Sequence, residues 1–264
     1  KQSPSIHMVF GTAFHEVIQH YLDVMYETSG AEADRIDVIE LLEEKIREEY
    51  SIQYKKNNNQ HFSSSEEIQE FFQDGVQILN YFKKNKGKYF SKKGWFLVGC
   101  EIPISIVPNN AYKNVIYNGF LDVVLYHEPT DTFQIIDIKT STKGWNSYAK
   151  KDEEKHFQLI LYKKYFAEQF GLEEKSIDIE FLIVRRKVYE DGEYPQKRIQ
   201  TFSPASGKNK TTKATNILNE FINEAFNYKG YKETLHVPRP SKWNCHFCAF
   251  KEDDKLCNVP GKNL

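Results

Sequence analysis

Two β-rich segments joined by a short polar turn constrain this chain more than any other stretch. They span residues 119–126 and 132–139, and the polar residues between them include one proline. This pattern predicts a β-hairpin. A turn that is symmetric about the Pro129–Thr130 bond places Asp122 directly opposite Asp137. Directly opposed side chains on an antiparallel pair lie about 4.5–5.5 Å apart at Cβ.

The hairpin is expected to hold three charged side chains at one end of a sheet. Side chains alternate along a strand, so Lys139 shares the face of Asp137 while Ile138 points the other way. Two carboxylates this close repel each other unless a proton or a cation lies between them. Mg²⁺ and Mn²⁺ accept such oxygen ligands, and a nearby lysine can stabilise charge in a transition state. The alternative is a surface hairpin with solvated charges, and a β-bulge would break the register.

Composition limits the class of protein. A chain of 264 residues that is 40% hydrophobic can bury one sizeable core. We expect one domain, 1–264, with a helical insertion at 28–90 and a cysteine-containing segment at 236–264. The mean hydropathy of −0.63 and the lack of a long apolar run predict no membrane span. A net charge of −1 means that a nucleic-acid partner would need locally grouped basic residues. Four cysteines, three of them clustered near the end, favour a reducing, cytoplasmic setting.

Helices and further strands are expected on both sides of the hairpin. The first helix is predicted to begin at Gly11, with Thr12 as its N-cap, and to carry His15 beside its apolar stripe. Further helices are predicted at 36–50, 64–85, 152–170 and 215–228, and strands at 95–107, 179–188 and 197–202. Asp37 and Ser64 are candidate N-caps, and the basic stretch 203–213 is predicted to be a loop.

Several polar residues outside the hairpin are candidates for the same site. Glu101 lies on the strand before the hairpin and is a further possible metal ligand. Basic and aromatic residues interleave in 140–151, which suits a loop that stacks on bases and holds phosphates, and equally suits a solvated loop. The candidates for contact with nucleic acid are Lys143, Trp145, Tyr148, Arg185 and Arg186.

Four short motifs follow one another in order along the chain. They are Gly11-x-x-x-His15, Gly119-x-x-Asp122, Asp137-Ile138-Lys139-Thr140 and Gln158-x-x-x-Tyr162. This ordered set resembles the RecB-like branch of the PD-(D/E)XK nuclease superfamily over roughly residues 10–250. The resemblance implies an α/β fold with a restriction-endonuclease-like core, in which helices flank a mixed β-sheet and a helical insertion is added.

The resemblance also implies a role for each motif residue. His15, Asp122, Asp137 and the Ile138 carbonyl would ligate Mg²⁺ or Mn²⁺, and Lys139 would position or activate the attacking water. Gln158 and Tyr162 would hold the substrate strand and the lysine. The implied reaction is hydrolysis of DNA phosphodiester bonds, foremost as a single-strand exonuclease in recombination, repair or replication, alone or beside a helicase. The alternatives are a structure-specific endonuclease, a non-catalytic DNA-binding subunit and, as a weaker case, a small-molecule phosphohydrolase.

The cysteines near the C-terminus form a second candidate metal site. Cys245, Cys248 and Cys257 include a Cys-x₂-Cys spacing that can chelate a metal. Three thiolates do not complete a zinc or iron–sulfur site. Similar nucleases that carry an iron–sulfur cluster take the fourth cysteine from upstream, and no cysteine precedes the first helix here. His246 or His236 is a possible fourth zinc ligand; alternatively, the three cysteines simply pack with neighbouring aromatic side chains.

Overall fold

The computed structural model describes residues 4–189, 196–227, 229–231, 240–246, 248, 250, 251, 253, 255 and 257. Its helices are α1 (Ile6–Glu27), α2 (Gly30–Arg35), α3 (Val38–Lys56), α4 (Ser65–Asn85), α5 (Ser147–Lys151), α6 (Glu153–Phe170), α7 (Lys208–Ala225) and α8 (Lys242–His246). Its strands are β1 (Trp95–Ile106), β2 (Tyr117–His127), β3 (Thr132–Ser141), β4 (Ile177–Arg185) and β5 (Ile199–Phe202). Short 3₁₀ turns lie at Lys86–Lys88, Asn110–Tyr112, Glu128–Thr130 and Glu174–Ser176.

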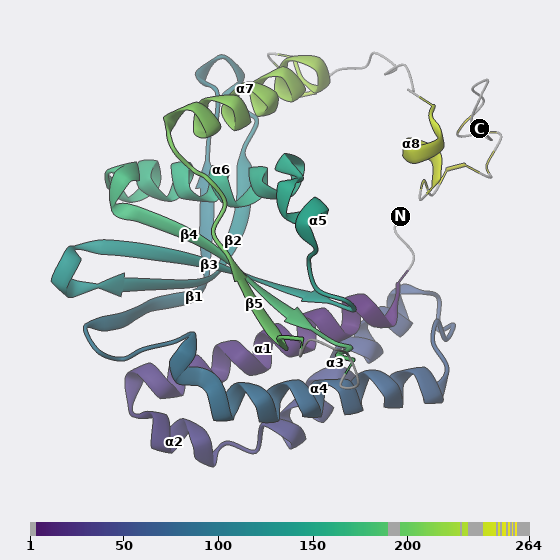
Figure 1. Ribbon diagram of the computed structural model, residues 1–264. Helices are drawn as coiled ribbons and strands as arrows, with labels where there is room; N and C mark the ends of the chain where they lie inside the picture. The colour runs from purple at the N-terminus through teal and green to yellow at the C-terminus, as the bar shows by residue number, and fades with distance from the viewer. Residues whose placement is uncertain are drawn as a thin grey trace.

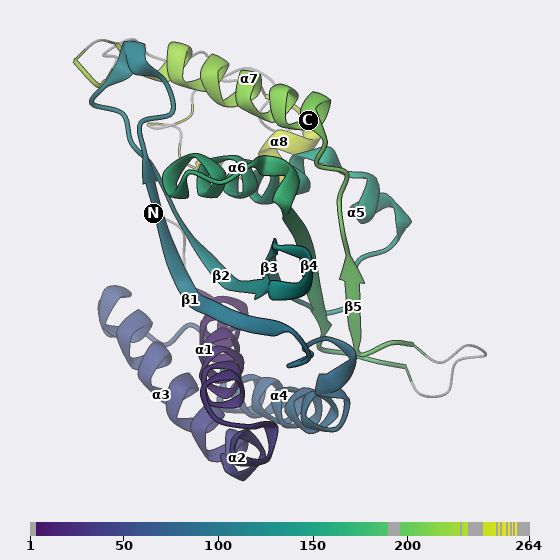
Figure 2. The ribbon, with the colours of Figure 1, turned by 90° about the vertical axis from the view of Figure 1, so that its left-hand side faces the viewer.

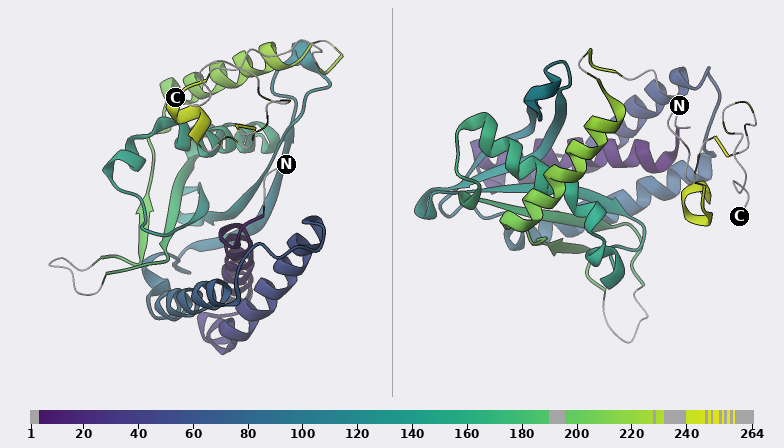
Figure 3. Two further views of the ribbon diagram at one scale, coloured as in Figure 1. Left: turned by 90° about the vertical axis from the view of Figure 1, so that its right-hand side faces the viewer. Right: turned by 90° about the horizontal axis from the view of Figure 1, so that it is seen from above.

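The strands form one mixed sheet between two layers of helices (Figure 1). The order is β1-β2-β3-β4-β5, in which β3 and β4 are parallel and the other neighbours are antiparallel. Viewed along its edge, the sheet has α1 to α4 on one face and α6 and α7 on the other (Figure 2). The opposite edge shows the same layers (Figure 3). This arrangement confirms the expected mixed sheet flanked by helices.

The central hairpin has the expected register. The paired residues of β2 and β3 run from His127 opposite Thr132 to Val123 opposite Ile136. Continuing this register by one residue places Asp122 opposite Asp137. The bulge that could have broken it lies instead in β1, where the pairing with β2 shifts between Leu97 and Gly99.

Each face of the sheet buries its own hydrophobic cluster. Ile136 and Ile138 join the cluster beneath α1 to α4, whereas Ile135 joins the one beneath α6. The alternation of β3 therefore turns Asp137 toward α6, where only 3% of its surface is exposed. Burial of apolar side chains on both faces fixes the register, because a shift of one residue would exchange the two faces.

Two helix starts differ from the expectation. Helix α1 begins at Ile6 with Ser5 as its N-cap, not at Gly11 with Thr12, because the buried stripe extends back through Val9. Helix α7 begins at Lys208, inside the stretch expected to be a loop. The other two proposed N-caps are confirmed: Asp37 accepts from the N–H groups of α3, and Ser64 accepts from the N–H of Glu67 in α4.

Residues 28–90 lie in the helical layer beside α1. Helices α2 to α4 share the same buried cluster as α1, which also includes the β2 and β3 side chains of that face. They therefore support the strands that carry the hairpin acids. Within the described part of the chain, every helix is too short or too polar to traverse a lipid bilayer.

Candidate active site

The charged residues of the hairpin converge where β2 and β3 meet the α6 face. The backbone N–H of Ile138 donates to Asp122 Oδ2 over 2.7 Å, which ties the first acid to the second strand. Lys139 Nζ lies 2.8 Å from Asp137 Oδ2. Two carboxylates and one ammonium group are thus held together on neighbouring strands, as the hairpin register requires.

Helix α1 brings His15 to the same point. Its Nδ1 lies 3.7 Å from Asp122 Oδ2. Burial lowers the pKa of His15 below its ordinary value, while Asp137 and the backbone of Ile138 act in the opposite direction. A lowered pKa favours the neutral imidazole, which is the form that ligates metals.

Burial also controls the two acids. It raises the pKa of Asp122 and that of Asp137 to about 6, and Lys139 opposes the change in both. The like charge of Asp122 adds to the rise at Asp137. The protein therefore holds two carboxylates that its own cations neutralise only in part.

Glu101 and Gln19 extend the site toward β1. Gln19 Nε2 donates to Glu101 Oε1 over 2.6 Å and to the Asp122 backbone carbonyl over 3.1 Å. Glu101 has a φ of 50°, a left-handed backbone that is unusual for a non-glycine residue. Sequence reasoning missed Gln19, although it lies four residues after His15 and so shares its helix face.

Helix α6 supplies the other side of the site. Lys139 Nζ donates to Gln158 Oε1 over 3.5 Å, and Gln158 Nε2 donates to the Tyr162 hydroxyl over 3.0 Å. A Cβ atom on Gly119 would lie 2.5 Å from the Tyr162 ring. Space therefore explains the glycine of the second motif, Gly119-x-x-Asp122: only a residue without a side chain lets the Tyr162 ring approach β2 this closely.

These residues fit a divalent cation in their chemistry. Asp137 Oδ2 is buried and accepts no hydrogen bond, because its contact with Lys139 has ion-pair distance without hydrogen-bond geometry. The carboxylates, the imidazole of His15 and the Ile138 carbonyl are ligand types that suit Mg²⁺ or Mn²⁺. Among the residues that the structure describes, however, no three His, Cys, Asp or Glu side chains are grouped closely enough to hold a metal. The ammonium of Lys139, rather than a third acid, contacts Asp137.

The residues expected to contact nucleic acid are not equivalent. Tyr148 of α5 is 82% exposed, and Lys143 is also exposed. Trp145 instead packs against Phe181, with ring centroids 4.9 Å apart, and against Phe202. Its half-buried indole packs against the cluster beneath α6, so less of the ring is open to a base than at Tyr148.

The two arginines at the end of β4 are buried. Arg186 Nη1 donates to Asp74 Oδ2 over 2.5 Å, and its guanidinium lies 3.9 Å from the centroid of the Phe71 ring. Arg185 Nη1 donates to Gln196 Oε1 over 2.8 Å. Both are predicted to contact DNA. In the structure each already has a partner within the protein, and Arg186 also lines the cavity at the end of β3.

The C-terminal cysteines are not brought together as a metal site. Cys245 is buried, Cys248 is exposed and Cys257 is half-buried, and none of the three is part of a disulfide bond among the described residues. They belong to no metal-holding group in the described residues, and neither does His246. His236, the other proposed ligand, lies outside the residues that the structure describes.

Comparison with known proteins places the fold. A search of curated protein sequences finds no significant match. A crystal structure reported as "Putative exonuclease" from Eubacterium rectale aligns with 94% of this chain and 82% of that chain, at 11% identity and a TM-score of 0.45. The family model of the PD-(D/E)XK nuclease superfamily matches residues 1–252. With its mixed sheet and restriction-endonuclease-like core, this chain belongs to the PD-(D/E)XK nuclease superfamily.

Proposed function

We propose that the protein is a Mg²⁺- or Mn²⁺-dependent deoxyribonuclease that shortens single-stranded DNA from its ends. Membership of the superfamily supports hydrolysis of phosphodiester bonds with the aid of a divalent metal. One observation carries the proposal furthest: Asp122, Asp137 and Lys139 converge beside His15 on a rigid hairpin. A superfamily member that had lost catalysis would not need to keep two buried carboxylates whose negative charge its own cations neutralise only in part.

The chain's own groups have separate tasks in this reaction. A divalent cation bound by His15, Asp122, Asp137 and the Ile138 carbonyl would polarise a phosphoryl oxygen and activate water. Lys139 presents an ammonium group at the edge of the acids, where it stabilises the charge that develops on the phosphate. Gln158 accepts a hydrogen bond from Lys139 and so fixes the position of the ammonium group.

A cavity of about 400 Å³ at the end of β3 offers room for the substrate strand. Its wall includes the hydroxyl-bearing residues Thr140, Ser141 and Thr142, which directly follow the catalytic lysine. Ser5, the N-cap of α1, and Arg186 also line the cavity. Hydroxyl groups and helix N-termini are common partners of nucleic-acid phosphates, so we assign the neighbouring phosphates of the strand to this cavity.

The finer assignments follow from the motif order. We propose a place in the RecB-like branch, action on DNA ends during recombination, repair or replication, and a cytoplasmic setting. A helicase that feeds single strands to the site would be a fitting partner. The ordered motifs from His15 to Tyr162 support this branch.

The test is degradation of end-labelled linear single-stranded DNA with Mg²⁺ or Mn²⁺, beside circular single-stranded DNA and an EDTA control. Asp137→Asn removes the charge of the central acid. Asp131→Asn is the matched control, because Asp131 lies in the turn at the other end of the same hairpin. We expect the wild type and the control to shorten the linear strand, to leave the circle intact and to need the metal.

Three results would change the proposal. Cleavage of the circle would make the protein an endonuclease. Full activity of Asp137→Asn would refute the assignment of the site. Binding of DNA without cleavage in any divalent metal would favour a non-catalytic DNA-binding subunit.

A further inference from the structure

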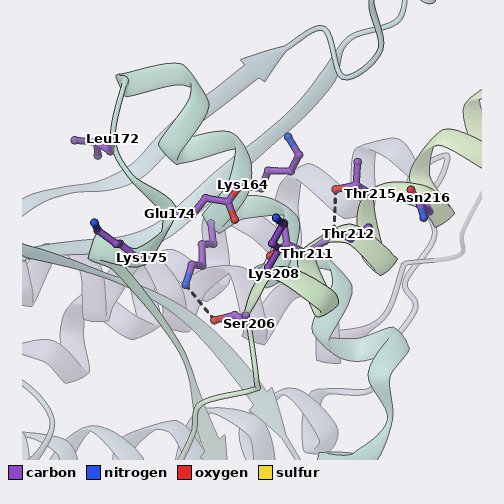
Figure 4. Close-up of a pocket in the computed structure, with 12 residues that line it drawn as sticks. Lys164, Leu172, Glu174, Lys175, Ser206, Lys208, Thr211, Thr212, Thr215 and Asn216 are labelled. Atoms are coloured by element: carbon purple, nitrogen blue, oxygen red, sulfur yellow. Dashed lines mark hydrogen bonds between the residues drawn. The ribbon is translucent and has the colours of Figure 1, made fainter.

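A second cavity lies between the C-terminal half of α6 and the start of α7 (Figure 4). Its volume is about 740 Å³. We call it the α6–α7 pocket and define it by Lys163, Lys164, Lys175, Ser206, Lys208 and Thr211. None of these residues belongs to the candidate active site. On α6, Tyr162 turns toward β2, whereas the next residue, Lys163, turns toward α7.

The central feature of the pocket is a buried cation. Lys163 is only 7% exposed, and its Nζ donates to the Ser206 hydroxyl over 3.2 Å. An ammonium group has three donors, and no described carboxylate lies within ion-pair distance of this one. Burial lowers the pKa of Lys163, whereas the negative charges of Asp178 and Glu174 act in the opposite direction. A buried cation with one neutral partner is costly unless an anion completes its contacts.

The N-terminal half of α7 lines the same pocket, beginning at Gly207 and Lys208. Gly207 is the N-cap and provides no capping side chain. The first N–H groups of a helix lack acceptors within the helix, and they carry its positive dipole end. Helix α7 has 18 residues, which is long enough for a full helix dipole with its positive end at the N-terminus.

An independent observation comes from Thr211. Its side chain is only 6% exposed, and its Oγ1 is buried without a hydrogen-bond partner. The residue lines the pocket one turn inside α7. A buried hydroxyl that lacks a partner calls for a polar group that the protein itself does not supply.

The chemistry of the wall selects the ligand class. Four lysines line the pocket against one carboxylate, Glu174, and Leu172 is the one large apolar side chain among the lining residues. Lys164 and Lys175 make exposed ion pairs with Glu168 and Glu173, which contribute little and leave the lysines able to turn. With no aromatic side chain in the wall, the pocket can recognise phosphate groups but has no surface for stacking a base.

We infer that the α6–α7 pocket binds a backbone phosphate of a nucleic-acid strand outside the active site. The identity of the ligand rests on the proposed function, whereas the preference for phosphate rests on the pocket. Phosphate contacts position a nucleic acid without reading its sequence. The pocket is thus a second anchor that fixes the strand relative to α6, the helix that carries Gln158 and Tyr162.

The test is the salt dependence of binding of a fluorescent single-stranded DNA, measured by fluorescence anisotropy in EDTA so that no cleavage occurs. Lys163→Met removes the buried charge with little change of shape. Lys55→Met on α3, which lies on the other face of the sheet, removes the same charge from an exposed position. We expect Lys163→Met to weaken binding several-fold and to reduce the slope of log K against log salt by about 0.7, the value for one phosphate on a single strand. Lys55→Met should leave both the DNA affinity and the slope of log K against log salt unchanged.

Stability separates binding from folding. Replacing a buried, poorly paired charge by an apolar side chain is expected to leave the unfolding midpoint unchanged or to raise it. If Lys163→Met does not fold, Ser206→Ala and Lys208→Met provide the same binding test. A second measurement is the rise in Tm caused by inorganic phosphate, which should be present in the wild type and lost in Lys163→Met.

Each combination of results either supports or contradicts the inferred phosphate site. Loss of DNA affinity and of the phosphate effect supports the inference. Loss of the phosphate effect with unchanged DNA binding assigns the pocket to a free phosphate compound and overturns the nucleic-acid ligand. If Lys163→Met changes neither the DNA affinity nor the rise in Tm caused by phosphate, the pocket is not a phosphate site. If the wild type binds DNA through Lys163 but never cleaves it, the proposed nuclease function fails while this anchor stands.

Discussion

The ends of β3 and β4 make an informative contrast, because they are parallel neighbours that both finish in charged residues. Lys139 pairs with Ile183 and Ser141 pairs with Arg185 in the sheet. The N–H of Arg186 continues this pairing by donating to the Ser141 carbonyl over 2.8 Å. The two strand ends therefore share one edge of the sheet and one local geometry.

Their charges are compensated very differently. At the end of β4, Arg186 and Lys187 both contact Asp74 and Glu70 of α4. At the end of β3, Asp137 is also buried, and its one ion pair among the described residues is with Lys139. Asp137 Oδ2 and Arg186 Nε are both buried without a hydrogen-bond partner, so the two ends differ in the number of their ion pairs. A charged strand end whose partners come from a neighbouring helix stabilises the fold, whereas one left partly uncompensated is available for a ligand.

The largest effect should follow from Asp137→Asn. We expect deoxyribonuclease activity to fall by at least about 10³-fold, because the metal's charge stabilisation is worth several kcal/mol. The unfolding midpoint in metal-free buffer should stay the same or rise, since a buried charge is removed. Activity assays and urea denaturation measure the two effects; a large loss of stability would erase the contrast between the strand ends.

The opposite result is expected for the isosteric change Asp74→Asn. It leaves the buried guanidinium of Arg186 without its main partner, which should cost about 3–5 kcal/mol of stability. Activity per folded molecule should be retained, because Asp74 does not contact the hairpin acids. Urea denaturation and cleavage at low temperature test this, with Asp137→Asn as the matched control. Unchanged stability together with weaker DNA binding would restore Arg186 as a DNA contact.

Local sequence rules predicted the register of the hairpin but not the ion pairs at the end of β4. The opposition of Asp122 and Asp137 needed only the length of one turn and the alternation of side chains. The two acidic partners of Arg186 lie 112 and 116 residues before it, on a helix whose docking depends on the whole core. No local pattern in the Arg185–Lys187 run distinguishes a buried ion pair from a DNA contact.

The same limit explains the other differences. Helix α7 starts in a polar stretch because small residues such as Thr211 and Ala214 pack against the protein, and such residues give a weak apolar period. The Cys245–Cys248 spacing permits chelation, but a metal site needs further ligands placed by tertiary structure. Trp145 lies in a polar loop, yet its ring packs against the aromatic side chains of β4 and β5.

A smaller effect is expected on the α6 side of the β3 end. Gly119→Ala places a methyl group 2.5 Å from the Tyr162 ring, which should cost about 1–3 kcal/mol of stability. The displaced tyrosine would disturb Gln158 and through it Lys139, lowering kcat by roughly 10–100-fold. The check is a double-mutant cycle with Tyr162→Ala. If Gly119→Ala costs as much stability without the ring, the clash is not the cause.

The smallest expected effect is the pH dependence of the stability that the Glu70 ion pairs provide at the end of β4. A hydrogen bond from Lys187 lowers the pKa of Glu70 below its ordinary value of 4.5, and one from Arg186 lowers it further. A lowered pKa in the folded state means that this pair stabilises the protein above pH 4.5 and that its contribution disappears as the pH falls through the folded-state pKa.

The difference in unfolding midpoint between the wild type and Glu70→Gln should therefore be full at neutral pH and shrink in acid below pH 4.5. It should also decrease with added salt, because Glu70 is exposed and its ion pairs are screened. Thermal unfolding of both proteins between neutral and acidic pH measures this. A difference that stays constant with pH would mean that Glu70 acts through packing, leaving Asp74 alone to neutralise the arginine at the end of β4.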